Sequence, residues 1–226
     1  MNNNKTAMCA VAGAALIASS AFAGPEWIEQ DDAGSNLATA QPTLGSGPLQ
    51  SIAGRLGVVQ SFLGGTDYED LFLITVQSPS LFTMQVTSAD FDAQLFVFNV
   101  TLPGQLFGLL ANNDTVLGDE PFVGNMATDS TGAQLLLPGV YVVGISGLGR
   151  NPLSNTGAIF NFQSQTEVSG ADGPGGINPL SGWTGEGQTG EYIIDVTGVT
   201  FYDLPEPGAM ALLAIAAGCA ARRRRR

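Results

Sequence analysis

The chain has 226 residues, a formal net charge of −12 and no histidine. Without histidine it can build neither a Ser-His-Asp or Cys-His catalytic site nor a His-ligated zinc site. The acidic balance also argues against nucleic acid as a partner, because binding to phosphates requires lysines and arginines. An enzyme built on this chain would have to use carboxylate chemistry.

The first 23 residues are typical of a secretory signal peptide. Lys5 precedes an apolar run over residues 7–17, and small residues follow at Ala21 and Ala23. Leader peptidases require small residues at such a site, so we expect cleavage between Ala23 and Gly24. Residues 1–23 are therefore predicted to form a signal helix that is removed on export.

Next along the chain, residues 24–204 are long enough for one domain with a hydrophobic core. This part has two basic residues, Arg55 and Arg150, against 19 acidic ones, which is a net charge of −17. It has no disulfide, because Cys9 and Cys219 lie in the terminal segments. We divide it into an extended lead-in over residues 24–50 and a β-domain over residues 51–204.

The pattern of the β-domain predicts strands throughout. Glycine and proline recur about every 8 to 12 residues, without a helical period. Alternating runs predict half-buried strands at residues 81–87 and 191–197. Runs that are apolar on both faces predict central strands, with the core on one side and a covering loop on the other. These runs cover residues 71–76, 95–100 and 140–145, and further strands are expected at 52–58, 106–111 and 159–163.

We therefore predict an all-β fold, a jelly-roll-like β-sandwich of about eight or nine strands. The signal helix and a short C-terminal hydrophobic helix would flank it.

Five short motifs of the β-domain support this fold. They are an aspartate turn at residues 67–70, a strand motif at 91–98, the turn Asn112-Asn113-Asp114, a Pro-Gly-x-Tyr motif at 138–141 and Gly-Glu-Tyr at 190–192. Together they resemble the bacterial pre-peptidase C-terminal domain. The resemblance implies a small jelly-roll-like module that accompanies secreted and surface proteins. The chain departs from that family by a long insert before the last strand.

That insert, over residues 164–190, has eight glycines and is too long for an ordinary hairpin connection. Its Trp183 has two interpretations: a ligand contact that stacks on a sugar ring, or an anchor that holds the loop on the sandwich. We favour the anchor, because a loop so rich in glycine needs an apolar contact to stay ordered.

Acidic and amide side chains gather at the predicted strand ends, where two interpretations stay open. They cap turns through hydrogen bonds to the backbone, or they bind calcium, a hard cation that takes six to eight oxygen ligands. No EF-hand loop is present to make calcium specific. We expect no other cofactor, and the candidate calcium ligands are Asp67, Asp70, Asp92 and Asp114.

The last 22 residues carry three features in order. A Pro-Glu-Pro motif comes first and an apolar run over residues 208–221 follows it. As a helix this run would be about 21 Å long, which is short for a hydrocarbon core of about 30 Å. The terminal arginines prefer the cytoplasmic side and would stall the segment there. The residues of the motif and of the basic end are Pro205, Glu206, Pro207, Arg222, Arg223, Arg224, Arg225 and Arg226.

These features resemble the PEP-CTERM tail of exported bacterial proteins. The resemblance implies transient membrane association through residues 205–226, then removal of the tail by an exosortase, a membrane-embedded protease. A retained membrane anchor is the alternative. In both cases we expect the protein at the cell surface or in the extracellular matrix. Signal peptidase and an exosortase-like protease would be its partners during export.

The predicted function is that of a non-enzymatic bacterial surface or extracellular-matrix protein. The alternative is an extracellular module that binds carbohydrate or protein, with or without calcium, which makes extracellular polysaccharide a candidate partner. A remote alternative is a carboxylate hydrolase, which needs two carboxylates about 5 to 10 Å apart in a cleft. The sequence shows no acid pair in apolar surroundings that would raise a pKa.

Overall fold

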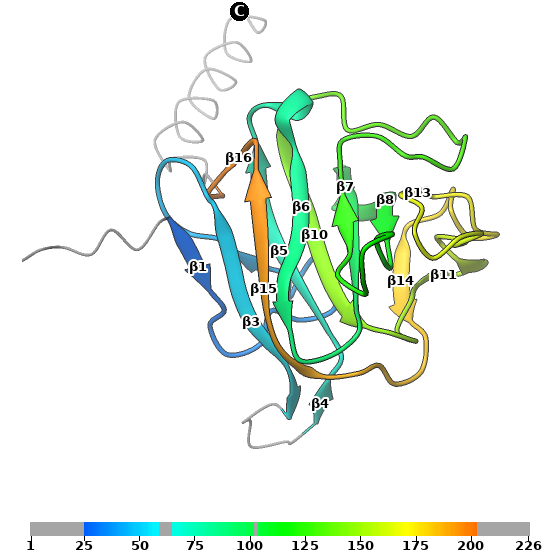
Figure 1. Ribbon diagram of the computed structural model, residues 1–226, viewed down its shortest axis with the longest axis horizontal. Helices are drawn as coiled ribbons and strands as arrows, with labels where there is room; N and C mark the ends of the chain where they lie inside the picture. The colour runs from blue at the N-terminus through cyan, green and yellow to red at the C-terminus, as the bar shows by residue number, and fades with distance from the viewer. Residues whose placement is uncertain (1–24, 59–64, 102–103, 203–226) are drawn as a thin grey trace, which may run out of the picture.

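The computed structural model describes residues 25–58, 65–101 and 104–202. These residues form an all-β structure of two large sheets and one small sheet (Figure 1). The predicted signal helix, the Pro-Glu-Pro motif, the predicted C-terminal helix and the five terminal arginines lie outside the described residues. Within the described ranges no helix is long and apolar enough to cross a membrane.

The first large sheet is mostly antiparallel, with one parallel pair between β1 and β3. Its strands in spatial order are β1 (Glu26–Ile28), β3 (Ser51–Val58), β15 (Gly190–Thr197), β6 (Thr83–Ala89) and β9 (Phe122–Val123), and β4 (Thr66–Asp67) also pairs with β3. A single 3₁₀ turn, η1 (Pro79–Leu81), precedes β6.

The second large sheet lies behind the first in Figure 1. Its strands in order are β13 (Ser169–Gly170), β8 (Gln105–Asn112), β7 (Ala93–Thr101), β10 (Gly139–Gly147), β5 (Glu69–Val76) and β16 (Val199–Thr200), with β2 (Gln41–Pro42) parallel to β5. The expected extended lead-in, residues 24–50, is described from residue 25 onward and supplies β1 to one sheet and β2 to the other.

The main hydrophobic core lies between the two large sheets. Ile145 of β10 is opposite both Asp70 of β5 and Leu95 of β7, so these three side chains share the face that meets the first sheet. This layered packing agrees with the predicted sandwich-like fold. Core residues from the two sheets include Ile52, Met84, Val86, Tyr192, Ile194, Phe72, Ile74, Leu95, Val97, Val143 and Ile145.

The outer face of β5, β10 and β7 is buried as well. There Leu71, Phe96 and Phe98 pack in a second core with Ile159, Phe160 and Trp183. The residues that cover this face run from 151 to 189 and are here called the covering segment. They include the small third sheet, of β12 (Gly157–Ala158), β11 (Pro152–Ser154) and β14 (Leu180–Trp183). The runs that are apolar on both faces are therefore central strands with a core on one side and a cover on the other, as predicted.

One predicted strand is wrong. Residues 159–163 do not form a strand. Ile159 and Phe160 are buried because they fill the second core from a loop. Their apolar character reflects this burial and not a place in a sheet.

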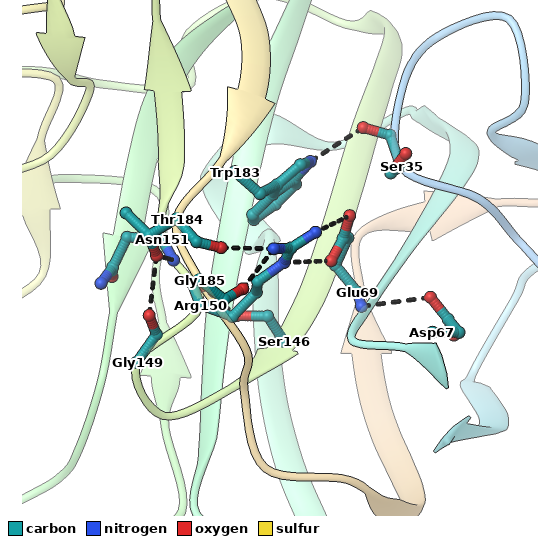
Figure 2. Close-up of polar contacts among 10 residues, drawn as sticks. All are labelled: Ser35, Asp67, Glu69, Ser146, Gly149, Arg150, Asn151, Trp183, Thr184 and Gly185. Atoms are coloured by element: carbon teal, nitrogen blue, oxygen red, sulfur yellow. Dashed lines mark hydrogen bonds and ion pairs between the residues drawn. The ribbon is translucent and has the colours of Figure 1, made fainter. Parts of the chain in front are cut away.

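Trp183 packs into the structure in the way that the anchor interpretation predicted. Its ring lies edge-on to Phe96 and Phe98, with centroids 5.6 and 6.4 Å away. Its Nε1 donates a hydrogen bond to the carbonyl oxygen of Ser35 at 2.8 Å (Figure 2). The side chain thus joins the covering segment to both the outer sheet face and the N-terminal segment.

We expect Trp183→Ala to lower the free energy of unfolding by about 3 kcal/mol, because it removes a large aromatic side chain from the second core. Urea denaturation followed by circular dichroism would measure the change. Ile177→Ala is the matched control in the same insert, since Ile177 is 87% exposed and its loss should change little. Unchanged stability in Trp183→Ala, with loss of binding on a glycan array, would favour the ligand interpretation instead.

Candidate functional site

One end of the sandwich holds a group of four acidic residues, here called the carboxylate cluster: Glu29, Asp32, Asp67 and Asp70. The last three each offer an oxygen within 4.8 Å of the other two. Glu29 and Asp32 follow β1, Asp67 ends β4, and Asp70 is the second residue of β5. The cluster thus joins the N-terminal segment to a strand of each large sheet.

Asp70 is the most enclosed member of the cluster, with 0% of its surface exposed. Its Oδ2 accepts a hydrogen bond of 2.6 Å from the Tyr192 hydroxyl, which reaches across from the first sheet. Its Oδ1 receives no hydrogen bond from any residue that the structure describes. Buried polar atoms are normally partnered, and the Asp70 carboxyl can be partnered in two ways: by a proton shared with the neighbouring Asp67 and Glu29 carboxylates, or by a bound cation.

A glycine makes room for this arrangement. A Cβ at Gly54 of β3 would overlap the Tyr192 hydroxyl and come within 2.6 Å of Glu29 Oε2. Glu29 instead approaches closely enough to accept hydrogen bonds from the backbone amides of Arg55, at 2.8 Å, and Ala33, at 3.2 Å. The N-terminal segment is therefore held against the first sheet through Glu29.

The carboxyl groups of the cluster are difficult to ionise together. Burial, with the nearby charge of Asp32, raises the pKa of Asp67 to about 7. Burial also raises the pKa of Glu29, and it holds the pKa of Asp70 well above its usual value, with the Asp67 and Glu29 charges adding to the effect. A bound cation would remove this penalty, because opposite charge favours the ionised form.

Within the described ranges, Arg150 and Glu69 form an ion pair, which lies on the outer face of the second sheet and not in the carboxylate cluster. Arg150 donates to the Glu69 carboxylate from Nε at 2.5 Å and from a terminal nitrogen at 3.0 Å (Figure 2). It also donates to the carbonyl oxygens of Thr184 and Gly185. Glu69 faces outward, whereas its neighbour Asp70 faces the main core. Arg150 is therefore engaged with the covering segment and does not neutralise the carboxylate cluster.

A second polar group lies at one end of the β7–β8 pair, and we call it the amide–carboxylate group. Each of its four side chains has a buried oxygen that accepts no hydrogen bond within the described part of the chain. Its members are Asp92, Gln94, Asn113 and Asp114.

The four predicted calcium ligands are thus split between two places. Asp67 and Asp70 lie in the carboxylate cluster, and Asp92 and Asp114 lie in the amide–carboxylate group. Sequence reasoning did not single out Glu29, Asp32 or Gln94 as ligands. No local signal marks Glu29 and Asp32, because it is the parallel pairing of β1 with β3 that places their segment beside β4 and β5.

The carboxylate cluster borders a cavity of about 1050 Å³ whose lining also includes Arg55, Asp90 and Glu191. The sequence showed no acid pair with a raised pKa, whereas the structure brings Asp67 and Asp70 together with this property. Their oxygens lie within 4.8 Å of each other and of an Asp32 oxygen, so the three carboxylates can share one ion. Because Asp70 is also enclosed, the geometry suits a cation better than a reacting sugar.

Comparisons with known proteins add no assignment, since no family model, curated protein or solved structure matches the chain.

The raised pKa values predict that the metal-free protein loses thermal stability as the pH rises from about 4 to about 7. In this window the unfolded chain has released protons that Glu29, Asp67 and Asp70 still bind in the folded chain, so each pH step favours unfolding. Scanning calorimetry in the presence of a chelator would measure the melting temperature. Asp67→Asn should flatten the pH dependence, while Asp195→Asn, at an exposed position of β15, should leave it as it is. A melting temperature that rises over the same window would contradict the prediction.

Proposed function

We propose that this chain is an exported, non-enzymatic β-sandwich protein of the bacterial surface or extracellular matrix, and that calcium at the carboxylate cluster completes its fold. The observation that carries the calcium is the buried Oδ1 of Asp70, which has no donor among the described residues and lies in a group with Asp32 and Asp67. Calcium binds several carboxylate oxygens at once and tolerates irregular geometry, as this cluster requires.

The role of the ion is structural. Asp70 belongs to the second sheet, Asp67 pairs through β4 with the first sheet, and Glu29 and Asp32 belong to the N-terminal segment. An ion bound to all three stretches links them without a disulfide. This suits a domain that carries no cysteine between residues 24 and 204.

The finer fold in this proposal is a jelly-roll-like sandwich of the pre-peptidase C-terminal type. Its support is the position of the motifs: the turn at residues 67–70 leads into β5, the 91–98 motif into β7, and the 138–141 motif into β10. The turn at residues 112–114 ends β8, and Gly-Glu-Tyr at 190–192 begins β15. The insert forms part of the cover on the outer sheet face.

The other functions weighed from the sequence have less support. Trp183, the candidate sugar contact, is engaged with Phe96, Phe98 and Ser35. Three carboxylates of the cluster have oxygens within 4.8 Å of one another, a spacing that suits a shared ion. A structural protein therefore accounts for the packing of Trp183 and for the carboxylate cluster better than a carbohydrate-binding module or a hydrolase does.

Calcium added to the metal-free full chain at pH 7 should raise its melting temperature. A ligand at about 100 times its Kd stabilises the folded state by about 2.7 kcal/mol, which corresponds to roughly 5 to 10 °C for a domain of this size. Asp67→Asn should reduce the response, and Asp195→Asn should keep it. Identical melting curves with calcium and with chelator in the unmodified chain would refute the calcium part of the proposal.

Mass spectrometry of the protein from its native cell tests the export part. We expect an N-terminus at Gly24 and a C-terminus near Pro205, because both terminal segments resemble processing signals. A mature chain that still ends at Arg226 would show that the tail is retained as an anchor.

A further inference from the structure

We propose that the amide–carboxylate group is a second, independent calcium site on the outer face of the second sheet. Gln94 of β7 lies opposite Ser146 of β10, whereas Asp70 of β5 lies opposite Ile145. Ile145 and Ser146 are neighbours on β10 and therefore face opposite sides of the sheet. Because paired residues share a face, Gln94 and Asp70 also point to different sides. The proposed site is therefore separate from the carboxylate cluster, and it rests on different residues.

Strand pairing places these four residues at the adjoining ends of β7 and β8. Leu95 pairs with Asn112 in the antiparallel β7–β8 ladder, which places position 94 next to position 113. Asp92 lies just before β7, two residues from Gln94, and Asp114 is held beside Asn113 by the hydrogen bond from Asn113 Nδ2 to Asp114 Oδ2. The pKa of Asp92 is raised by burial and then by the charges of Asp114 and Asp119, as expected for carboxylates that lie near one another.

The two amides are the strongest indication of a ligand. Gln94 is 2% exposed and Asn113 is 3% exposed. Their NH₂ groups are engaged, since Gln94 Nε2 donates to Asn151 Oδ1 at 3.2 Å and Asn113 Nδ2 donates to Asp114 Oδ2 at 2.9 Å. Their carbonyl oxygens accept nothing from the described residues. Two almost fully buried amides, at the adjoining ends of β7 and β8, thus each have a carbonyl oxygen without a donor among the described residues.

The carboxylates complete the same pattern. Oδ1 of Asp92 and Oδ1 of Asp114 are also buried and receive no hydrogen bond within the described ranges. Four buried acceptors without donors, all in residues at the adjoining ends of β7 and β8, are unusual in a native protein. A cation shared by the four oxygens accounts for all of them at once.

The set of oxygens favours calcium over other cations. It consists of two carboxylates and two amide carbonyls, without nitrogen or sulfur. Calcium takes six to eight such oxygens and leaves its remaining positions to water, whereas magnesium keeps most of its water and uses one or two carboxylates. Asp92 and Asp114 are only partly buried, so water can reach the ion from their side.

The site lies where the covering segment meets the sandwich. The Asp92 amide donates to Gln188 Oε1 at 3.1 Å, and the Asp114 amide donates to the carbonyl oxygen of Gln165 at 2.9 Å. Gln94 contacts Asn151, at the start of the same segment. Calcium here would stabilise the ends of β7 and β8 where these residues form hydrogen bonds with the covering segment.

Counting bound calcium tests both sites. Isothermal titration of the chelator-treated full chain should give two ions for the unmodified chain, one for Asp92→Asn/Asp114→Asn and one for Asp67→Asn. A single ion that Asp67→Asn removes and the double variant keeps would overturn the second site and leave the first. A single ion with the reverse behaviour would overturn the first site and leave the second, and a chain that binds no calcium would overturn both.

Substitution of Gln94 separates metal binding from a purely structural role. In the Asp67→Asn background, Gln94→Glu should bind calcium about tenfold more tightly, because it adds a carboxylate to the ligand set. Gln94→Met, which keeps the length of the side chain but removes the oxygen, should bind more weakly. If Gln94→Glu leaves the affinity unchanged, Gln94 is not a ligand and the site as described is wrong.

Discussion

The whole structure depends on the burial of both faces of β5, β10 and β7. One face meets the first sheet in the main core, and the other meets the covering segment in the second core. Removal of this apolar surface from water is the dominant source of stability for a domain without a disulfide. Polar side chains fit on such strands only near their ends, and both acidic groups are found there.

Charge sets a second constraint, which follows from the first. Arg150 lies over the outer face and is held by Glu69 and two carbonyl oxygens. The rest of the domain is strongly acidic. Burial raises the pKa values of Asp67 and Asp70, and the charges of neighbouring carboxylates add to the effect. A cation from the surroundings would let these groups ionise together, because opposite charge favours the ionised form. Extracellular calcium is the simplest source, and it connects the proposed sites to the predicted destination of the protein.

Much of the fold could be predicted because strand patterns are local. The apolar runs within β5, β7 and β10 stand out in the sequence, and the turn at residues 67–70 identified two members of the carboxylate cluster. Gln94 escaped notice because a single amide beside an apolar run looks like an ordinary strand residue. Ile159 and Phe160 were mistaken for a strand because burial in a loop leaves the same apolar signature as burial in a sheet.

By itself, the sequence determined the all-β character of the domain, the absence of histidine and disulfide chemistry between residues 24 and 204, and the prediction of export from its two ends. Only the tertiary structure decided which acids meet. Asp67 and Asp70 join Asp32 and not Asp92, because parallel pairing of β1 with β3 brings the N-terminal segment to them, while the pleat turns Gln94 to the opposite face. The two-residue period of a strand is a local property that the sequence shows directly. A cation site needs oxygens from distant parts of the chain within a few ångströms of one another, and long-range strand pairing brings them together.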